Sequence, residues 1–268
     1  MTTYEASDAS ESSEIPAASK APEATETFLA AFVAAIVPVV PLRAVWAHGS
    51  LGGGDYQEGR SDLDLVAVLE RPCTSAERAG LDSAHRRVGA TSPLAPHLHC
   101  AYVPVAELGE LDAPHLSWWY EELCDHRPVT EVTRRELHAF ARVLHGEAPA
   151  GLLPPVTDAE LSAFIRRDLT GFWRKALANE ANWRQDIWID GGLLVLARAS
   201  VTLRSGRLIT KAEALDVLVE LGAPGELVAD VRNRRYGLTG PDARTEEWLA
   251  RRAELAVSFL DAQIRRVE

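Results

Sequence analysis

The spacing of apolar residues in the first half of the chain predicts a small domain of mixed helices and strands. Short apolar runs bounded by Gly, Pro and polar residues are typical of strands, and longer segments with apolar positions three to four apart are typical of helices. The predicted elements are a helix over 25–37, strands over 42–47, 63–69 and 98–105, a helix over 74–88, and a short helix that begins at or holds 118–120. Thr74 and Glu77 have the spacing of a capping box, which supports a helix start there.

The second half has a different character, because its apolar positions recur at helical spacing only. Predicted helices cover 129–144, 158–180, 187–204, 210–221 and 242–267, with Gly- and Pro-rich segments between them. The predicted fold class is therefore α+β, with a mixed domain over 27–126 and an all-α helical bundle over 127–268. Residues 1–26 hold six acidic residues and one basic residue among Ser, Thr, Ala and Pro, which predicts a disordered acidic tail, either merely solvated or binding a partner.

Composition narrows the classes of function. The chain has 268 residues, of which 47% are hydrophobic and 25% charged, enough for one large or two modest domains. Its 28 basic and 39 acidic residues give a net charge of −11, which argues against nucleic-acid binding. No apolar run reaches the roughly 18 residues of a membrane span, and we expect no signal peptide. Cys73, Cys100 and Cys124 form no disulfide framework, so we expect a reducing, cytoplasmic setting.

Residues suited to catalysis or ligand binding cluster around the loop between the first two predicted strands. Gly49 and Ser50 directly follow the first strand. A glycine-rich loop then leads through Ser61 to Asp62 and Asp64, which open the second strand. Consecutive main-chain N–H groups in such a turn form a concave site that suits a phosphate. Two carboxylates two positions apart on a strand point to one face and repel each other unless a cation lies between them. Mg²⁺ shared with substrate phosphates fits best, so the pattern predicts metal-assisted transfer from a nucleoside triphosphate.

These residues resemble the nucleotidyltransferase superfamily with the polymerase-β-like minimal fold. Segments 193–198, 205–214 and 234–237 are similar to the helical C-terminal domain of the streptomycin–spectinomycin adenylyltransferases. The resemblance implies a minimal nucleotidyltransferase domain followed by a helical domain, with ATP and acceptor bound between them. It also implies a reaction, in which AMP moves from ATP to a hydroxyl of an aminoglycoside or aminocyclitol antibiotic and pyrophosphate leaves.

The resemblance further implies roles for the motif residues. Asp62 and Asp64 would hold two Mg²⁺ ions, while Gly49 and Ser50, with Ser61 close by, would bind the phosphates of ATP.

Later positions match nucleotide and acceptor contacts of the same family. Lys211 and Tyr236 match positions that contact ATP, although a solvated first-turn lysine and a core aromatic are the simpler alternatives. Trp119 matches a substrate-stacking tryptophan. Asp186 and Asp190 are four residues apart at the start of a predicted helix, so they share a face that suits a cationic acceptor. Favourable placement at a helix N-terminus is the alternative for Asp186.

The third strand departs from the family pattern. Where the family has a carboxylate that acts as general base, our alignment places His99. A neutral imidazole accepts a proton near pH 7, but it binds Mg²⁺ less readily than an oxygen anion does. Three alternatives follow: His99 is the base, another residue is the base, or the site has lost or changed its activity.

Three functions therefore stay open. The first is an Mg²⁺-dependent adenylyltransferase that acts on a small molecule, with no nucleic-acid or membrane partner. The second is a nucleotidyltransferase of the same fold that modifies a protein or another metabolite. The third is a non-catalytic nucleotide- or drug-binding relative, which the missing carboxylate favours. The sequence leaves the oligomeric state open.

Overall fold

A six-stranded mixed sheet forms the core of the N-terminal domain. The structure is a computed structural model that describes residues 21–110, 113–237 and 245–267, with the backbone alone at 126–128. Residues 1–20 of the predicted tail lie outside the described part. The strands are β1 Leu42–Ala47, β2 Leu63–Leu69, β3 Leu98–Pro104, β4 Pro114–Trp119, β5 Glu122–Pro128 and β6 Arg142–Gly146, in the order β5-β4-β3-β2-β1-β6. Strands β2 and β3 are parallel, and the other neighbouring pairs are antiparallel.

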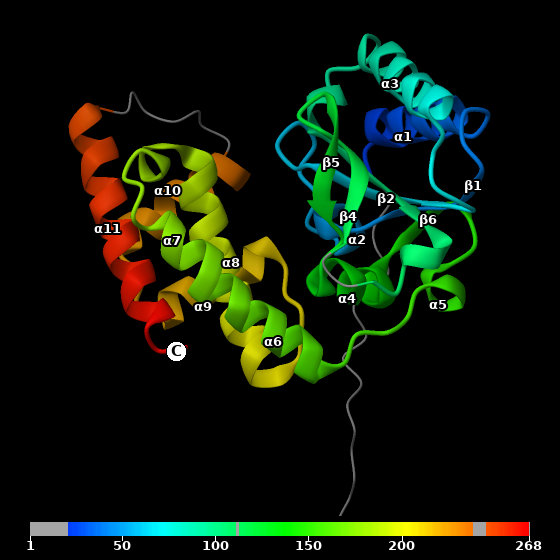
Figure 1. The fold of residues 1–268 in the computed structure, drawn as a ribbon. Coiled ribbons are helices and arrows are strands. Elements are labelled where there is room, and N and C mark those ends of the chain that lie inside the picture. The colour runs from blue at the N-terminus through cyan, green and yellow to red at the C-terminus, as the bar shows by residue number, and fades with distance from the viewer. Residues whose placement is uncertain (1–20, 111–112, 238–244, 268) are drawn as a thin grey trace, which may run out of the picture.

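Helices cover both faces of this sheet and build the second domain (Figure 1). Those of the N-terminal domain are α1 Glu23–Ile36, α2 Gly49–Gly52, α3 Ser75–Gly89, α4 Glu131–Phe140 and α5 Pro149–Leu152. Those of the helical domain are α6 Asp158–Asp168, α7 Arg174–Ala176, α8 Asp186–Ser205, α9 Lys211–Glu220, α10 Gly225–Tyr236 and α11 Glu246–Ile264, with a π-helical segment over Leu169–Trp173 between α6 and α7. The predicted α+β architecture is confirmed. In the described part of the chain, no helix is long and apolar enough to cross a membrane.

Alternation along β2 separates the two faces of the sheet. Leu63 and Leu65 are buried in the apolar core that α1 and α3 cover. Val66 and Val68 belong to the smaller core on the opposite face, beside Leu137 of α4. Because side chains alternate along a strand, Asp64 shares this second face. The candidate residues of β2 therefore lie on the α4 side of the sheet.

Two predictions of local structure were wrong. Residues 118 and 119 lie in strand β4, not in a short helix, and β4 turns into β5 through Tyr120 and Glu121. Both turn residues have positive φ (47° and 61°), the conformation of a tight hairpin. Neither is glycine or asparagine, so the usual sequence signal of a hairpin is missing. The helix predicted over 129–144 ends at Phe140 as α4, and its last three positions belong instead to β6, which pairs with β1.

Strand β6 and the start of helix α1 lie outside the limits 27–126 predicted for the N-terminal domain. The sheet takes β6 from beyond the expected boundary at residue 126. Helix α1 begins at Glu23, inside the segment expected to be a disordered tail. Its Glu26 carboxylate accepts hydrogen bonds from Arg142 at 2.9 Å, which ties the start of the helix to β6. The acidic composition of this segment gives no sign of that long-range contact.

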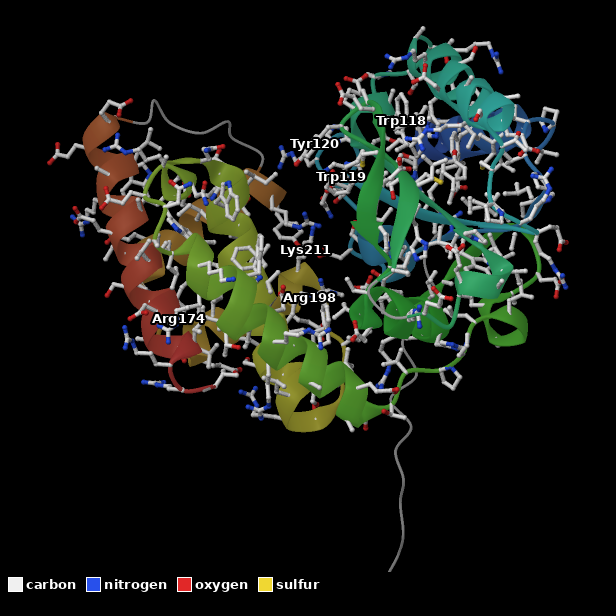
Figure 2. All side chains as sticks on the ribbon, in the orientation of Figure 1. Trp118, Trp119, Tyr120, Arg174, Arg198 and Lys211 are labelled. Atoms are coloured by element: carbon white, nitrogen blue, oxygen red, sulfur yellow. The ribbon has the colours of Figure 1, made fainter. Side chains whose placement is uncertain are left out.

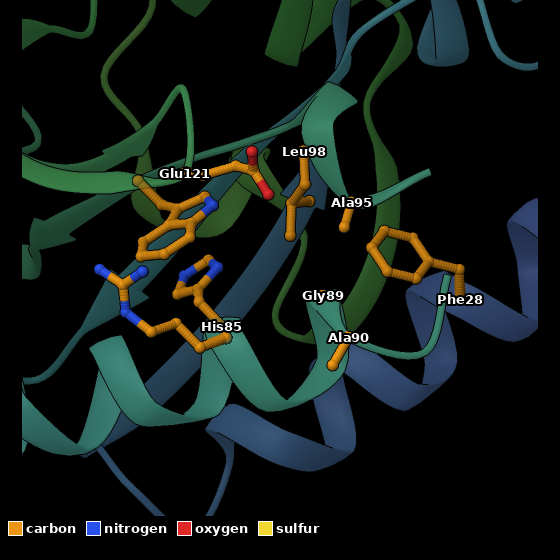
Figure 3. Close-up of a pocket in the computed structure, with 9 residues that line it drawn as sticks. Phe28, His85, Gly89, Ala90, Ala95, Leu98 and Glu121 are labelled. Atoms are coloured by element: carbon orange, nitrogen blue, oxygen red, sulfur yellow. The ribbon is translucent and has the colours of Figure 1, made fainter. Parts of the chain in front are cut away.

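A cavity of about 320 Å³ lies on the face of the sheet that α1 and α3 cover (Figure 3). Phe28 of α1 lies across it from His85 of α3. His85 is 2% exposed, stacks on Trp118 with ring centroids 4.2 Å apart, and shares a 2.6 Å hydrogen bond with the Tyr102 hydroxyl. This imidazole is therefore part of the core and takes no part in the candidate site on the other face.

Lowering the pH is expected to destabilise the fold through His85. Burial lowers the pKa of this imidazole to about 3, whereas a histidine in an unfolded chain titrates near 6.5. Between these values the unfolded state binds more protons, so the free energy of unfolding falls as the pH drops from about 6.5 toward 3. Denaturant unfolding at pH 7 and pH 5 measures this effect. The free energy of unfolding of His85→Gln should fall by about 2 kcal/mol less between these pH values than that of the wild type. Equal losses would contradict this assignment.

Candidate active site

The turn after β1 lies directly against Asp64. Gly49 has φ +60°, and a Cβ atom at this position would stand 2.7 Å from Asp64 Oδ2. The amide of His48 donates to the carbonyl of Asp64 at 3.0 Å, which fixes the turn to the start of β2. Ser50 follows in the single helical turn of α2. The glycine-lined turn and the carboxylate that the sequence predicts to act together are thus adjacent.

The substitution Gly49→Ala tests this close approach. The added methyl group forces a left-handed backbone on a residue with a side chain and displaces the Asp64 carboxylate. We expect the variant to fold but to lose about 10²-fold in nucleotide transfer, since displacements on the order of 1 Å cost that much. Steady-state kinetics beside Gly54→Ala provides the check, because Gly54 also has positive φ but no atom within 4 Å of the place a Cβ would take. Equal effects of the two substitutions would show that backbone strain alone, not the approach to Asp64, is responsible.

Each aspartate of the pair has a histidine neighbour on β3 or directly before it. His99 pairs with Asp64 in the parallel register, and its Nδ1 lies 3.5 Å from Asp64 Oδ1. His97 Nδ1 lies 3.9 Å from Asp62 Oδ1. Burial would raise the pKa of the Asp64 carboxyl, but His99 and His48 outweigh it and hold that pKa below its usual value. Asp64 is therefore a carboxylate at neutral pH, although it is only partly exposed.

His99 is enclosed between Asp64 and an aromatic side chain. Trp119, its neighbour across the β3–β4 pair, lies over the imidazole with ring centroids 3.5 Å apart. His99 is 6% exposed, and neither ring nitrogen has a hydrogen-bond partner within the described residues. The predicted base and the predicted stacking tryptophan thus lie in direct contact, with the Asp64 carboxylate on the Nδ1 side of the imidazole.

The helical domain contributes cations to the same region. Figure 2 shows Lys211 and Arg198 on the side of the helical domain that faces the sheet, and Trp119 and Tyr120 on the side of the sheet domain toward the helices. Burial, together with Arg235, lowers the pKa of the Lys211 ammonium, while Asp64 and Asp62 act in the opposite direction. Lys211 therefore interacts electrostatically with both aspartates from the start of α9.

Asp55, which sequence reasoning did not single out, connects the two domains. Its Oδ2 accepts hydrogen bonds from the backbone amides of Lys211 (3.0 Å) and Ala212 (3.2 Å) at the start of α9. The Tyr236 hydroxyl donates to the same carboxylate at 2.8–2.9 Å. A carboxylate at a helix N-terminus satisfies free N–H groups and the helix dipole. The Tyr236 hydroxyl therefore serves the contact between domains, and only its ring remains for a nucleotide.

Ser61 also takes part in domain contact. It is 1% exposed, and its hydroxyl accepts hydrogen bonds from the Gln57 amide (3.0 Å) and the Arg235 guanidinium (3.2 Å). Arg60 donates to backbone carbonyls at the end of α10, including that of Arg235 at 3.0 Å. The glycine-rich loop is thus held against α10, and the Ser61 hydroxyl takes part in that contact.

Asp186 and Asp190 are bound by arginines. Arg252, which is fully buried, donates to Asp186 at 2.6 Å, and Arg234 lies 2.5 Å from Asp190. Asp230 accepts from both arginines, at 3.1 Å and 2.8 Å. Burial raises the pKa of the Asp190 carboxyl, and Arg234 only partly opposes this shift. The predicted acceptor-binding aspartates therefore belong to an ion-pair cluster between α8, α10 and α11.

The two aspartates suit an Mg²⁺ ion that is bound jointly by protein carboxylates and substrate phosphates. Across residues 21–110, 113–237 and 245–267, no group of three or more His, Cys, Asp or Glu side chains is arranged to hold a metal ion. Protein sites for Mg²⁺ with substrate phosphates, however, need only one or two carboxylates, and phosphate and water oxygens complete the octahedron. Asp62 and Asp64 provide this number of carboxylates, and the Gly49 turn lies against Asp64. The site is thus suited to a metal that arrives with a triphosphate.

Comparison with known proteins relates this chain to a solved structure. Neither a protein-family model nor a curated protein matches the sequence. Among solved structures, the chain is similar to spectinomycin adenyltransferase AAD(9) from Enterococcus faecialis, which was solved with ATP and spectinomycin. The match has a TM-score of 0.67 and 16% sequence identity, and it covers 88% of this chain and 98% of that chain. This chain therefore shares the fold of that protein, a mixed-sheet domain followed by a helical region.

Proposed function

We propose that this protein is an Mg²⁺-dependent adenylyltransferase that moves AMP from ATP to a hydroxyl of a small molecule, an aminoglycoside or aminocyclitol antibiotic. The observation that carries the proposal is the direct approach of the Gly49 turn to the Asp64 carboxylate. That approach joins an anion-binding turn to a metal-binding carboxylate, which are the two parts that nucleotidyl transfer requires.

Asp62 and Asp64 would hold the magnesium ions, two in number by family resemblance. Bound there, Mg²⁺ would neutralise the charge that develops on the phosphates. The backbone amides of the turn at Gly49 and Ser50 bind the β- and γ-phosphates as hydrogen-bond donors. Lys211, which lies within reach of both aspartates, balances the remaining negative charge of the triphosphate from the other domain.

His99 accepts the proton of the attacking hydroxyl. In the transfer, the acceptor oxygen forms a bond to the α-phosphorus and the bond between that phosphorus and the bridging oxygen breaks, so pyrophosphate leaves with the electron pair. The proton of the hydroxyl moves to Nε2 of His99, for which the described residues provide no hydrogen-bond partner. Asp64, 3.5 Å away, stabilises the imidazolium that results. An imidazole in this arrangement replaces the third carboxylate of related enzymes.

The acceptor binds beside Trp119, whose ring flanks His99. A polycationic aminocyclitol is attracted by an aromatic face and by the acidic surroundings of the aspartate pair. The similarity to an enzyme solved with spectinomycin supports this class of acceptor. Asp186 and Asp190 act on the acceptor through the field of their ion-pair cluster, since both carboxylates already pair with arginines.

Transfer of label from ATP tests the proposal. The protein is incubated with Mg²⁺ and ATP labelled at the α-phosphate, together with spectinomycin or other aminocyclitols. We expect α-label to appear on an acceptor and a γ-labelled substrate to release its label as pyrophosphate. Omission of Mg²⁺ serves as the control. Label on the acceptor from γ-labelled ATP would identify a kinase instead and overturn the proposal.

The replacement of the third carboxylate by His99 favours one second candidate, a nucleotide- or drug-binding protein without transferase activity. The same experiment separates the two functions. Binding of ATP and aminocyclitol with no pyrophosphate release from any acceptor supports the second candidate. Label on a protein, with none on small molecules, identifies a protein-modifying nucleotidyltransferase.

A further inference from the structure

Helix α4 packs against the turn that follows β1. Its residues Glu136 and Phe140 are four positions apart and therefore share one face. A Cβ atom at Gly52 would stand 2.6 Å from the Phe140 carbonyl oxygen, so the helix packs against the turn with no space between them. One turn earlier along the same face, Glu136 reaches His48, the residue that opens the turn.

Glu136 bonds a residue from each domain at once. Its Oε2 lies 3.0 Å from His48 Nδ1, and its Oε1 accepts a 2.6 Å hydrogen bond from the Arg198 guanidinium of α8. Glu136 is 5% exposed, so both ion pairs are shielded from solvent. Charge-assisted hydrogen bonds that are buried and short fix the orientation of both partners.

Arg198 is itself oriented toward the candidate site. Its Nε donates to the carbonyl of Ile209 at 3.0 Å, two residues before Lys211. Through this bond and the Glu136 carboxylate, Arg198 connects His48 with the segment that leads into α9. A single buried carboxylate thus connects the turn after β1 with α8, next to the start of α9.

We infer that Glu136 is a positioning residue, which fixes the turn at His48–Gly49 and the Arg198 guanidinium in one geometry across the two domains. The consequence for ATP binding rests on the proposed function, whereas the consequence for the turn does not. Without Glu136, His48 and Arg198 lose their shared partner, and the turn is no longer held to the helical domain through α8.

Hydrogen exchange tests the inference without nucleotide. The amides of Gly52 and Gly53 donate within the turn, to the carbonyls of His48 (3.2 Å) and Gly49 (2.9 Å). In Glu136→Gln, a carboxamide of the same shape cannot accept from both partners as the carboxylate does. We expect exchange of these two amides to be at least about ten-fold faster than in the wild type. His138→Gln, an exposed position on the same helix, is the matched control. Exchange in Glu136→Gln at the rate of this control would overturn the inference.

ATP affinity provides the second readout. We expect Glu136→Gln to weaken ATP binding and raise KM for ATP about ten-fold with little change in kcat, since Glu136 touches neither substrate nor reacting atoms. Added to Arg198→Gln, the same change should have a smaller effect than in the wild type, because the two residues act through one contact. Fully additive effects of the two substitutions on ATP binding would overturn the inference. If Glu136→Gln alone fails to fold, the double variant is still compared with Arg198→Gln, because it removes both charges of the ion pair. A wild-type chain that binds no ATP contradicts the proposed function, and the exchange comparison then decides the inference alone.

Discussion

Replacing Asp64 by asparagine is expected to abolish nucleotide transfer while the fold is retained. The amide keeps the shape of the side chain against Gly49, so the turn does not move. It loses the negative charge that the site directs at a cation, and loss of one metal ligand at a phosphoryl-transfer site costs several kcal/mol of transition-state stabilisation. We expect turnover to fall by at least about 10³-fold, because each 1.4 kcal/mol is a factor of about ten.

Pyrophosphate release in the presence of an accepted aminocyclitol measures this loss. Asp82→Asn is the matched control, since Asp82 pairs with Arg86 on the outer surface of α3. Circular dichroism and thermal unfolding establish that both variants are folded. Turnover of Asp64→Asn within about three-fold of this control would show that the carboxylate takes no part in the reaction.

The substitution Arg252→Met is expected to cause the largest loss of stability. Arg252 is fully buried, and its guanidinium donates to Asp186, Asp230 and the carbonyl of Arg184. Removing one member of a buried ion-pair cluster leaves uncompensated carboxylates, at a cost of about 3–5 kcal/mol. We expect a comparable fall in the free energy of unfolding, because methionine fills the volume but supplies no donor.

The adjacent Arg251 offers an internal control. It pairs with Glu226, and both side chains are well exposed (63% and 38%), so Arg251→Met should change the free energy of unfolding by at most about 0.5 kcal/mol. Denaturant unfolding of the two variants gives the comparison. Similar stabilities would show that the cluster of Asp186, Asp190 and Asp230 does not depend on its buried arginine.

Local patterns in the sequence were sufficient to predict how the motif residues are arranged. Strand alternation placed Leu63 and Leu65 in the core and the aspartates on the other face, and the structure brings Gly49 to Asp64 as the motif requires. The parallel register sets His99 beside Asp64, on the strand that the sequence predicted to pair next to the motif. These relations depend on neighbouring strands, whose geometry is regular.

Contacts between distant segments could not be predicted in this way. Asp55 caps α9 across 156 positions, and Glu136 meets Arg198 across 62, so no local pattern signals either pair. Helix α10 was missed because its buried apolar residues are only Leu227, Val228 and Val231, too few to give a clear helical stripe. Residues that orient the site are thus harder to find than residues that act in it.

Binding of ATP with and without Mg²⁺ tests the central claim most directly. The wild-type protein and the double variant Asp62→Asn/Asp64→Asn are titrated with ATP by calorimetry, first with Mg²⁺ and then with EDTA. If the two aspartates bind the metal that accompanies the triphosphate beside Gly49, Mg²⁺ should tighten binding at least about ten-fold in the wild type and have no such effect in the variant. The same Mg²⁺ dependence in both proteins would contradict the claim that this carboxylate pair is the metal site.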